Sequence, residues 1–356
     1  MRSVDNRATL HPAPAGLFPS AEHLSRARGL AQRFPEAHLR EVTLIRAPIE
    51  RPGSRLRIWL ALESMQVTGS FKVRGALLAV EALVAAAGAA QAASGKGAPV
   101  EVIAASAGNH GIGVSLAAKV LGAKATVVIP RGAPRTKTDK IASYGATIVH
   151  AQSTGYDDAE AEAIELARTR GLPFLSPYDD LDVLTGNGAS LGYEIIEKLG
   201  KVPDLVYAPI GGGGLATGLA LAITDDTSAP TRRVWGVQSE ASCAFAKSLE
   251  TGVAVTTLPP AETLAEGLEG GISVRGFARA RQVLAGAIVV TEDELANAMR
   301  FGVRELGLTL EGSAAVALAA ALAAPSDVDA RVREGDLVVV LTGRNVDPDR
   351  LARVVC

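Results

Sequence analysis

Lys72 is the residue whose surroundings most strongly suggest chemistry. It stands in the run Thr-Gly-Ser-Phe-Lys72-Val-Arg74, among small and apolar neighbours, where a predicted helix opens. An amine that is desolvated, or that lies near another cation such as Arg74, has a lowered pKa and becomes a nucleophile. An arbitrary lysine at a helix start is usually a solvated side chain, but the residues that precede Lys72 favour a nucleophile.

A tetraglycine loop (residues 211–214) follows a predicted buried strand and leads into a helix that begins near Leu215. Backbone amides at a helix N-terminus, with no Cβ in the way, form a site for a phosphate group. Four consecutive glycines are costly to order, so a purely structural loop is a poor explanation. The loop therefore predicts a phosphate site.

The loop also admits a dinucleotide interpretation, because Gly211-x-Gly213-x-x-Ala216 fits the loose fingerprint of that class. The acidic residue expected after the next strand is replaced by Gln238, with Glu240 only a shifted candidate. A P-loop is excluded because no Gly-Lys-Ser/Thr sequence follows. The dinucleotide interpretation stays open at this point.

Two further polar stretches directly follow predicted strands. The first is Ser106-Ala-Gly-Asn109-His110-Gly, where hydroxyl, amide and backbone donors gather at a helix N-terminus and suit a carboxylate. His110 taken alone is more typical of a packing residue than of a catalyst. The second stretch is Thr342-Gly-Arg-Asn345.

The elements that must position these stretches alternate along most of the chain. Short apolar runs predict strands at residues 57–62, 101–105, 125–129, 147–151, 205–209, 233–238 and 337–341. Helical patterns cover residues 111–121, 156–171, 180–199, 215–223, 292–307 and 313–324. Such alternation indicates an α/β fold with a parallel sheet, and open parallel sheets bind ligands at the carboxyl ends of their strands.

Composition excludes several classes of protein. Hydrophobic residues make up 48% of the chain, enough for a sizeable core, and 36 basic against 38 acidic residues give a net charge of −2. Nothing therefore indicates a nucleic-acid or membrane partner, and the alanine-rich run 76–93 is too weakly hydrophobic to span a bilayer. Cys243 and Cys356 form no metal-like or redox pair, and the first 20 residues lack a signal-peptide core. We expect a cytoplasmic protein.

The motifs, in this order, resemble those of the fold-type II pyridoxal-phosphate enzymes, and within them the serine/threonine dehydratase (ammonia-lyase) branch. The resemblance runs from about Thr43 to Asn345, most of the chain. It rests on Thr-Gly-Ser-Phe-Lys72-Val-Arg-Gly-Ala, Ser106-Ala-Gly-Asn109-His110, Tyr178-Asp-Asp, the tetraglycine loop, Glu311-Gly-Ser-Ala-Ala and Thr342-Gly-Arg-Asn345.

The resemblance implies roles for the matching residues. Lys72 is the catalytic residue, which holds pyridoxal 5'-phosphate through a Schiff base and later moves protons. Phe71 lies beside the ring, Asn109 bonds the phenolic oxygen, and Thr342 bonds the ring nitrogen. The phosphate cup is formed by Gly211, Gly212, Gly213, Gly214 and Leu215, and the substrate carboxylate is held by Ser106, Ala107, Asn109 and His110. Glu311 and Arg344 are candidates for positions near the ring, although Arg344 replaces a small residue and can instead point outward.

The implied reaction is β-elimination of a β-hydroxy amino acid, such as threonine or serine, to a 2-oxo acid and ammonia. The alternatives are β-replacement or racemisation on the same fold, a dinucleotide-dependent oxidoreductase, and a catalytically silent binding protein. Racemisation is disfavoured because Ala107 stands where related racemases carry a basic serine hydroxyl. The Leu268-Glu-Gly-Gly271 segment departs from threonine dehydratases and weakens threonine as the substrate.

The resemblance also implies two open-sheet α/β domains, as in the tryptophan synthase β-subunit, with the cofactor between them. Residues 1–87 and 179–356 are expected to form the large domain and residues 88–178 the small one. We expect a homodimer without a C-terminal regulatory domain. We expect no bound metal, because the segment 236–244 has neither of the carboxylates with which many relatives bind a cation in its usual place. Hard cations need charged oxygen ligands, and Glu240 alone is a poor site.

Overall fold

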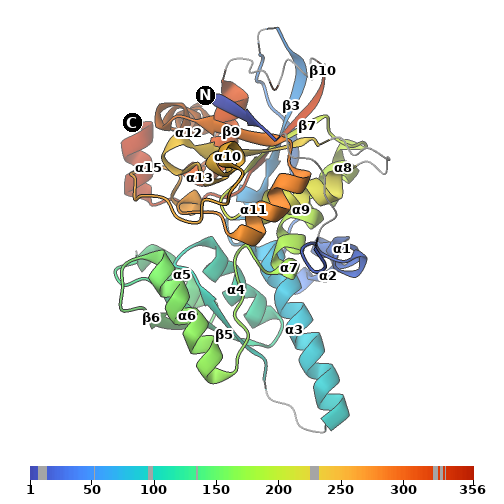
Figure 1. Cartoon of the computed structure of the whole chain (residues 1–356), viewed down its shortest axis with the longest axis vertical. Helices are drawn as coiled ribbons and strands as arrows, with labels where there is room; N and C mark the ends of the chain where they lie inside the picture. Colours follow the sequence, from blue (N-terminus) through green and yellow to red (C-terminus); the bar gives the residue numbers. More distant parts are fainter. Residues whose placement is uncertain are drawn as a thin grey trace.

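The computed structural model describes residues 1–6, 14–51, 53–94, 99–133, 135–224, 232–323, 328, 332 and 334–356. Two sheets organise these residues, and Figure 1 shows them in the upper and lower halves of the molecule. The larger sheet has seven strands in the order β1-β9-β8-β7-β10-β3-β2, and the smaller has three in the order β4-β5-β6. The α/β class is confirmed.

The seven-stranded sheet is parallel in its centre and antiparallel at both edges. Its strands are β1 (Arg2–Asp5), β2 (Leu44–Arg46), β3 (Arg55–Leu62), β7 (Leu205–Pro209), β8 (Val234–Ser239), β9 (Gly286–Val290) and β10 (Glu334–Leu341). The edge strands β1 and β2 pair antiparallel with β9 and β3. Leu341 of β10 pairs with Leu62 of β3, so these two strands end side by side.

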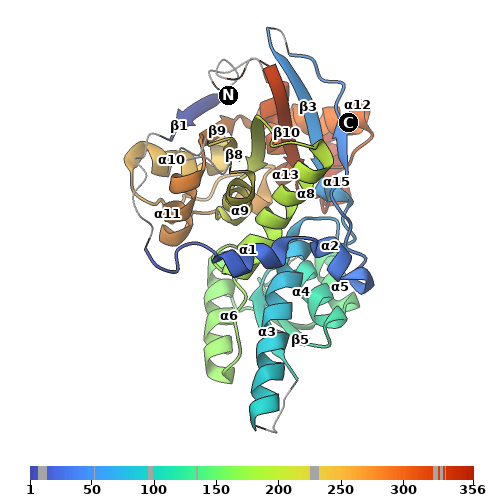
Figure 2. The same cartoon turned by 90° about the vertical axis from the view of Figure 1, so that its right-hand side faces the viewer.

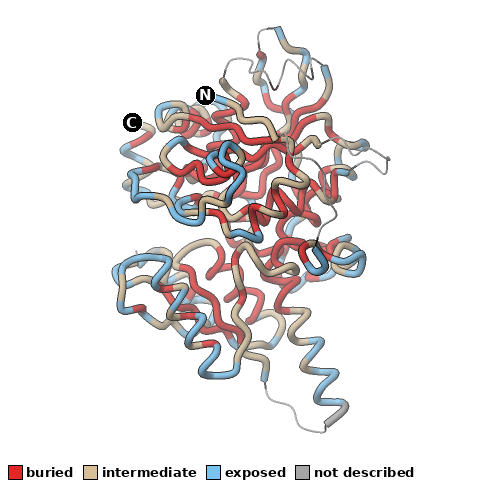
Figure 3. The backbone as a smooth tube through the Cα atoms, viewed as in Figure 1, coloured by how far each residue is buried: buried red, intermediate tan, exposed pale blue. Residues whose placement is uncertain are grey.

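Helices cover both faces of this sheet. Successive side chains of β10 point alternately to the two faces, and both sets are buried. Leu337, Val339 and Leu341 pack in one hydrophobic cluster with α12 (Glu292–Leu306), α13 (Gly312–Leu322) and α15 (Pro348–Val355). Val338 and Val340 pack on the other face. The helices there are α8 (Ser190–Leu199), α9 (Gly214–Ile223), α10 (Ala244–Thr251) and α11 (Val274–Val283). In Figure 3 the buried residues accordingly follow the sheet and the exposed ones follow the outer helices and loops.

The three-stranded unit (residues 101–170) consists of β4 (Glu101–Ala105), β5 (Lys124–Ile129) and β6 (Thr147–His150), all parallel, with three helices. These helices are α4 (Asn109–Val120), α5 (Arg135–Ser143) and α6 (Tyr156–Arg170). Helix α6 packs alanines 159, 163 and 167 against β4 and β5, and α5 inserts Ile141 beside Val127 and Ile129.

Helix α3 (Lys72–Ser94) starts at the large sheet and runs along the three-stranded unit, as Figures 1 and 2 show. Its first half shares a hydrophobic cluster with β4, β5, α4, α2 (Leu30–Arg33) and residues 34–39. Helix α1 (Ala21–Ala27) packs Ala27 against Ala189 and Ala222 instead. Of the described helices, α3 alone has the length and apolar composition to cross a membrane, and 44% of that stretch is buried inside the protein. Core packing of its first half accounts for the apolar composition.

A close crossing of helices explains one difference from the predicted elements. Residues 180–199 were expected to form one helix, but α7 (Leu181–Leu184) and α8 are joined by a π-helical turn, Thr185–Ala189. A Cβ on Gly186 would lie 2.7 Å from the Arg74 carbonyl oxygen, and one on Gly188 would lie 2.4 Å from the Leu215 carbonyl oxygen. These glycines let α3 and α9 approach the turn.

All seven predicted strands form, each within three residues of its expected bounds. The sequence reasoning missed β1 and β2, which are short, partly exposed edge strands. It also missed β9, a five-residue apolar run that periodicity alone does not distinguish from a helix segment. Within the described ranges, the remaining short helices are 3-10 turns at Pro35–Ala37, Glu63–Met65, Glu240–Ser242 and Glu266–Leu268.

Candidate functional site

A cavity of about 1120 Å³ brings together the four polar stretches identified in the sequence. They follow β3, β4, β7 and β10, so the carboxyl ends of strands from both sheets contribute to one site. The sequence-predicted residues that line the cavity are Phe71, Lys72, Ser106, Ala107, Asn109, His110, Gly211, Gly212, Gly213, Gly214, Leu215, Glu311 and Thr342. Arg344 is not among the cavity's lining residues.

Lys72 is the first residue of α3, and a pairing of two loops holds it beside Thr342. The backbone N–H of Phe71 donates to the Thr342 carbonyl at 3.0 Å, and Ser70 forms a β-bridge with Gly343. The Lys72 Nζ donates to the Pro177 carbonyl oxygen at 3.1 Å and lies 5.2 Å from the centre of the Phe71 ring. The paired loops therefore hold the start of α3, and the Pro177 carbonyl holds the amine in the cavity.

Burial lowers the pKa of Lys72 to about 8, while the nearby charge of Glu311 acts in the opposite direction. Desolvation is thus the cause of its nucleophilic character, as the sequence suggested. A substantial fraction of the amine is neutral near physiological pH. The other cause suggested by the sequence, the cation of Arg74, does not contribute to the lowered pKa of Lys72.

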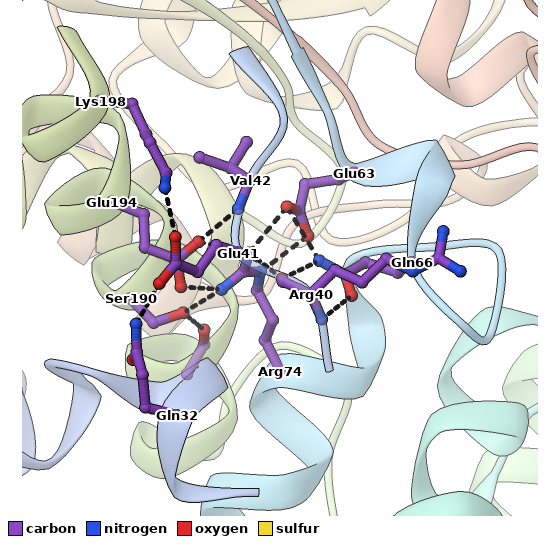
Figure 4. Close-up of polar contacts among 11 residues, drawn as sticks. Gln32, Arg40, Glu41, Val42, Glu63, Gln66, Arg74, Ser190, Glu194 and Lys198 are labelled. Carbon is purple, nitrogen blue, oxygen red and sulfur yellow. Dashed lines mark hydrogen bonds and ion pairs between the residues drawn. The ribbon is translucent and has the colours of Figure 1, made fainter. Parts of the chain in front are cut away.

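Arg74 is not among the residues that line the cavity, and it lies in a buried ion cluster (Figure 4). Its guanidinium donates to both carboxylate oxygens of Glu63 at 2.7 and 2.9 Å and to both of Glu194 at 2.8 Å. Burial acts to lower the pKa of Arg74, but the two carboxylates outweigh it and raise the pKa. The carboxylates neutralise the cation, and the cluster fixes the first turn of α3 to α8 and to the Glu63–Met65 turn.

The tetraglycine loop forms a cradle at the start of α9. Gly213 has φ +91°, a conformation that favours glycine, and it caps the helix. A Cβ on Gly212 would lie 2.6 Å from the Cβ of Tyr178, so a side chain there would displace the loop. Free amides at a helix N-terminus, closely approached on one side and open to the cavity on the other, suit a phosphate group.

The Ser106–His110 stretch also ends at a helix, because Asn109 and His110 form the first turn of α4. The Ser106 hydroxyl accepts a hydrogen bond from the Gly108 N–H at 3.0 Å, which leaves its own hydrogen to donate. The His110 ring is buried and its Nε2 lies 3.0 Å from the Leu175 carbonyl. Since a carbonyl only accepts, Nε2 carries the hydrogen and Nδ1 has none.

The imidazole of His110 is therefore not a donor to a carboxylate. Burial and the charge of Lys72 lower its pKa to about 3, which keeps the ring neutral. His110 could offer an anion its ring N–H or its backbone N–H. The ring N–H is used by the Leu175 carbonyl, so the backbone N–H is the available donor. This amide, and not the ring, is therefore the group of His110 that fits the predicted role.

Asn109 and Glu311 face each other in the cavity. Asn109 Nδ2 donates to the two carboxylate oxygens of Glu311 at 2.8 and 3.1 Å. Burial raises the pKa of Glu311, and hydrogen bonds from Asn109 partly oppose that effect. Glycine is needed at position 343, because a Cβ there would lie 2.4 Å from Glu311 Oε1.

Arg344 takes the outward one of its two expected positions. Its Nη1 lies 3.5 Å from the Met65 sulfur, at an exposed edge. Gly75 and Gly111, which belong to two of the sequence motifs, serve close packing. A Cβ on Gly75 would lie 2.4 Å from the Val183 carbonyl oxygen, and one on Gly111 would lie 2.5 Å from the Ser106 carbonyl oxygen.

Sequence reasoning missed several polar groups at the site. Tyr178 donates to both Glu160 oxygens at 2.8 and 2.6 Å, and burial raises the pKa of this tyrosine. Lys140 donates a hydrogen bond to Asn345, which in turn donates one to Asn109. Asn345 lies in a motif that could have suggested it, whereas nothing in the sequence separates Lys140 from the other charged residues of its helix.

Gln238 is engaged by protein groups at both ends of its amide. Its Nε2 donates to the Ile210 carbonyl at 3.0 Å, and its Oε1 accepts from the Ala246 N–H at 3.1 Å. No group of three metal-ligating side chains occurs among the residues that the structure describes. The expectation of an enzyme without a bound cation stays a prediction.

The donor set fits pyridoxal phosphate, and the comparisons with known proteins agree. Residues 36–343 match the family model described as pyridoxal-phosphate dependent enzyme. The chain is 37% identical to the catabolic L-threonine dehydratase of Escherichia coli over 300 residues, which are 83% of this chain and 85% of that protein. It is 33% identical to the L-threonine ammonia-lyase of Thermotoga maritima, over 84% of this chain and 69% of that one.

A solved structure supports the same assignment. The processed form of threonine deaminase isoform 2 from Solanum lycopersicum superposes with a TM-score of 0.79 at 26% identity, covering 99% of this chain and 97% of that one. The resemblance seen in the sequence motifs is thus confirmed over nearly the whole fold. The chain belongs to the pyridoxal-phosphate dependent enzymes of fold-type II, in the threonine dehydratase family.

Proposed function

We propose that this enzyme catalyses β-elimination of a β-hydroxy amino acid, such as threonine or serine, to a 2-oxo acid and ammonia. The observation that carries the proposal is Lys72, an amine with a pKa of about 8 in the same cavity as the tetraglycine cradle. The names of the relatives, threonine dehydratase and threonine ammonia-lyase, support this reaction over the dinucleotide-dependent alternative.

The residues that would hold the cofactor are those that the sequence identified. Lys72 would bind it covalently as a Schiff base, with Phe71 beside the ring and the amides of residues 211–215 on the phosphate. Asn109 would donate to the phenolic oxygen, and the Thr342 hydroxyl would meet the ring nitrogen. When bound, pyridoxal phosphate supplies an electron sink that acidifies the Cα–H bond of an attached amino acid.

The start of α4 would bind the substrate carboxylate. The Ser106 hydroxyl has a hydrogen to donate, and the amides of Ala107, Asn109 and His110 lie at or just before a helix N-terminus, where anions are stabilised. Once released from the cofactor by the substrate amine, Lys72 is the group that would take up the Cα proton, because its lowered pKa increases the neutral fraction that can accept one. The Pro177 carbonyl would then accept a hydrogen bond from the ammonium.

Two other reactions on the same fold remain as alternatives. Racemisation would need a group on the opposite face of the ring that gives and takes a proton. Related racemases have a serine at the position of Ala107, whose methyl side chain has no exchangeable proton. β-Replacement would need a second nucleophile. Incubation with a panel of 3-hydroxy amino acids, with and without a thiol, separates the three by their products: 2-oxo acid and ammonia, a thioether, or the opposite enantiomer.

We also propose a domain division, an oligomeric state and a cellular location for this enzyme. Residues 88–178 would form the small domain and residues 1–87 with 179–356 the large one, with α3 packed against both; limited proteolysis tests this division. The resemblance supports a homodimer, which light scattering tests. A cytoplasmic location is supported by two free cysteines, Cys243 buried and Cys356 exposed.

A further inference from the structure

We propose that Lys140 is a positioning residue, which fixes the amide orientation of Asn109 through Asn345. Lys140 lies on α5 and is not among the residues that line the cavity. The inference rests on the proposed function, since it concerns how Asn109 is prepared to meet the cofactor.

A continuous row of hydrogen bonds links Lys140 to Glu311. Lys140 Nζ donates to the Thr68 carbonyl at 2.8 Å and to Asn345 Oδ1 at 3.1 Å. Asn345 Nδ2 donates to the same Thr68 carbonyl at 2.9 Å and to Asn109 Oδ1 at 2.6 Å. Asn109 Nδ2 donates to the Glu311 carboxylate at 2.8 and 3.1 Å. An ammonium thus stands at one end of the row and a carboxylate at the other.

The two ends determine the direction of every bond between them. An ammonium only donates hydrogen bonds and an ionised carboxylate only accepts them. If the amide of Asn345 were rotated by half a turn, its NH₂ group would face the Lys140 ammonium. If that of Asn109 were rotated, its oxygen would face Glu311. Each rotation would replace a hydrogen bond with a repulsive contact.

The consequence reaches the cofactor site. Because of this polarity, the amide nitrogen of Asn109, rather than its oxygen, is on the Glu311 side. That nitrogen is the donor needed for the proposed bond to the phenolic oxygen. Lys140 would therefore contribute without touching the cofactor.

The row also connects the two parts of the fold. Lys140 and Asn109 belong to the three-stranded unit, whereas Thr68, Asn345 and Glu311 belong to segments at the large sheet. The row of hydrogen bonds requires glycine at position 69, because a Cβ there would lie 2.5 Å from Asn345 Oδ1. The contact of α5 with the segments that carry Thr68 and Asn345 is thereby coupled to the orientation of Asn109.

The test compares Lys140→Met with Lys140→Arg and with Arg135→Met, which removes an exposed cation from the same helix. Pyridoxal phosphate binding is measured by titration of the cofactor-free proteins, together with the visible absorption of the bound cofactor. We expect Lys140→Met to bind about tenfold more weakly, the order expected when a hydrogen bond to a charged group is lost. Its absorption maximum should also shift. Lys140→Arg should stay within about threefold of the parent protein, and Arg135→Met should match it.

The thermal midpoint of each variant without cofactor checks that it folds. A second variant, Lys140→Gln, keeps an N–H donor without the charge, and its loss of cofactor affinity should lie between those of Lys140→Arg and Lys140→Met. Equal binding and equal spectra in Lys140→Met and the parent would overturn the proposal, as would equal losses in the Met and Arg variants. Failure of the parent protein itself to take up pyridoxal phosphate would instead contradict the proposed function.

Discussion

The amide nitrogen of Asn109 donates to both carboxylate oxygens of Glu311, although the two residues lie 202 positions apart in the chain. Burial raises the pKa of this carboxyl, so its ionised form opposes folding. For a carboxyl with a raised folded-state pKa, stability falls as pH rises from the unfolded-state pKa through the folded-state pKa. The burial of Glu311 therefore costs stability at neutral pH, and the hydrogen bonds from Asn109 offset part of that cost.

Glu311→Gln should flatten the decline in the free energy of unfolding that begins near the ordinary glutamate pKa of about 4.3 and continues as pH rises, because the group that titrates is removed. It should also lower kcat by roughly tenfold, because the acceptor for Asn109 loses its charge. Urea unfolding at several pH values and steady-state kinetics measure the two effects. Glu197→Gln, on the exposed side of α8, is the control. An unchanged pH dependence of stability in Glu311→Gln would show that this carboxyl ionises as freely in the folded state as in the unfolded one.

The reactivity of Lys72 should level off near pH 8 in the cofactor-free protein. Its neutral amine increases about tenfold per pH unit below its pKa of about 8 and then becomes constant. Acylation by a small anhydride, followed residue by residue with mass spectrometry, measures this profile. A lysine peptide in the same solution should continue to gain reactivity toward its ordinary pKa near 10.4. A Lys72 profile that follows the peptide would contradict the account of desolvation.

Arg74→Met should be among the most destabilising single changes in this protein. Arg74 and Glu63 are fully buried, so removal of the guanidinium leaves Glu63 and Glu194 without a counter-ion, at a cost of about 3–5 kcal/mol. Urea denaturation measures the loss. Arg168→Met, which breaks an exposed pair with Glu165, should leave the midpoint unchanged. Similar midpoints for the two variants would mean that the buried cluster is not needed to hold α3.

Gly212→Ala should weaken pyridoxal phosphate binding at least tenfold, because the new Cβ would lie 2.6 Å from the Tyr178 Cβ and displace the loop. Gly88→Ala is the matched control: it lies within α3 with nothing within 4 Å, so it should stabilise the protein by about 0.5–1 kcal/mol. Fluorescence titration with the cofactor and thermal unfolding measure both. Parent-like affinity in Gly212→Ala would mean that the phosphate is bound elsewhere.

Much of the site was predictable because motif residues follow strands, and parallel strands bring their carboxyl ends together. Lys72, Asn109 and the tetraglycine loop meet in one cavity for that reason. The pairing of Arg74 with Glu194 was not predictable, because a charged residue gives no local sign of a partner 120 positions away. The orientation of the His110 ring depends on a single carbonyl, that of Leu175, which no pattern in the sequence indicates.

The most direct test of the central claim compares the parent protein with Lys72→Ala after both have been incubated with pyridoxal phosphate. The account predicts a yellow parent protein that releases equal amounts of 2-oxo acid and ammonia from threonine, serine or another 3-hydroxy amino acid. It predicts that Lys72→Ala lacks both the visible absorption of the parent and the release of product. A colourless parent protein, or product release from Lys72→Ala at the parent rate, would contradict it.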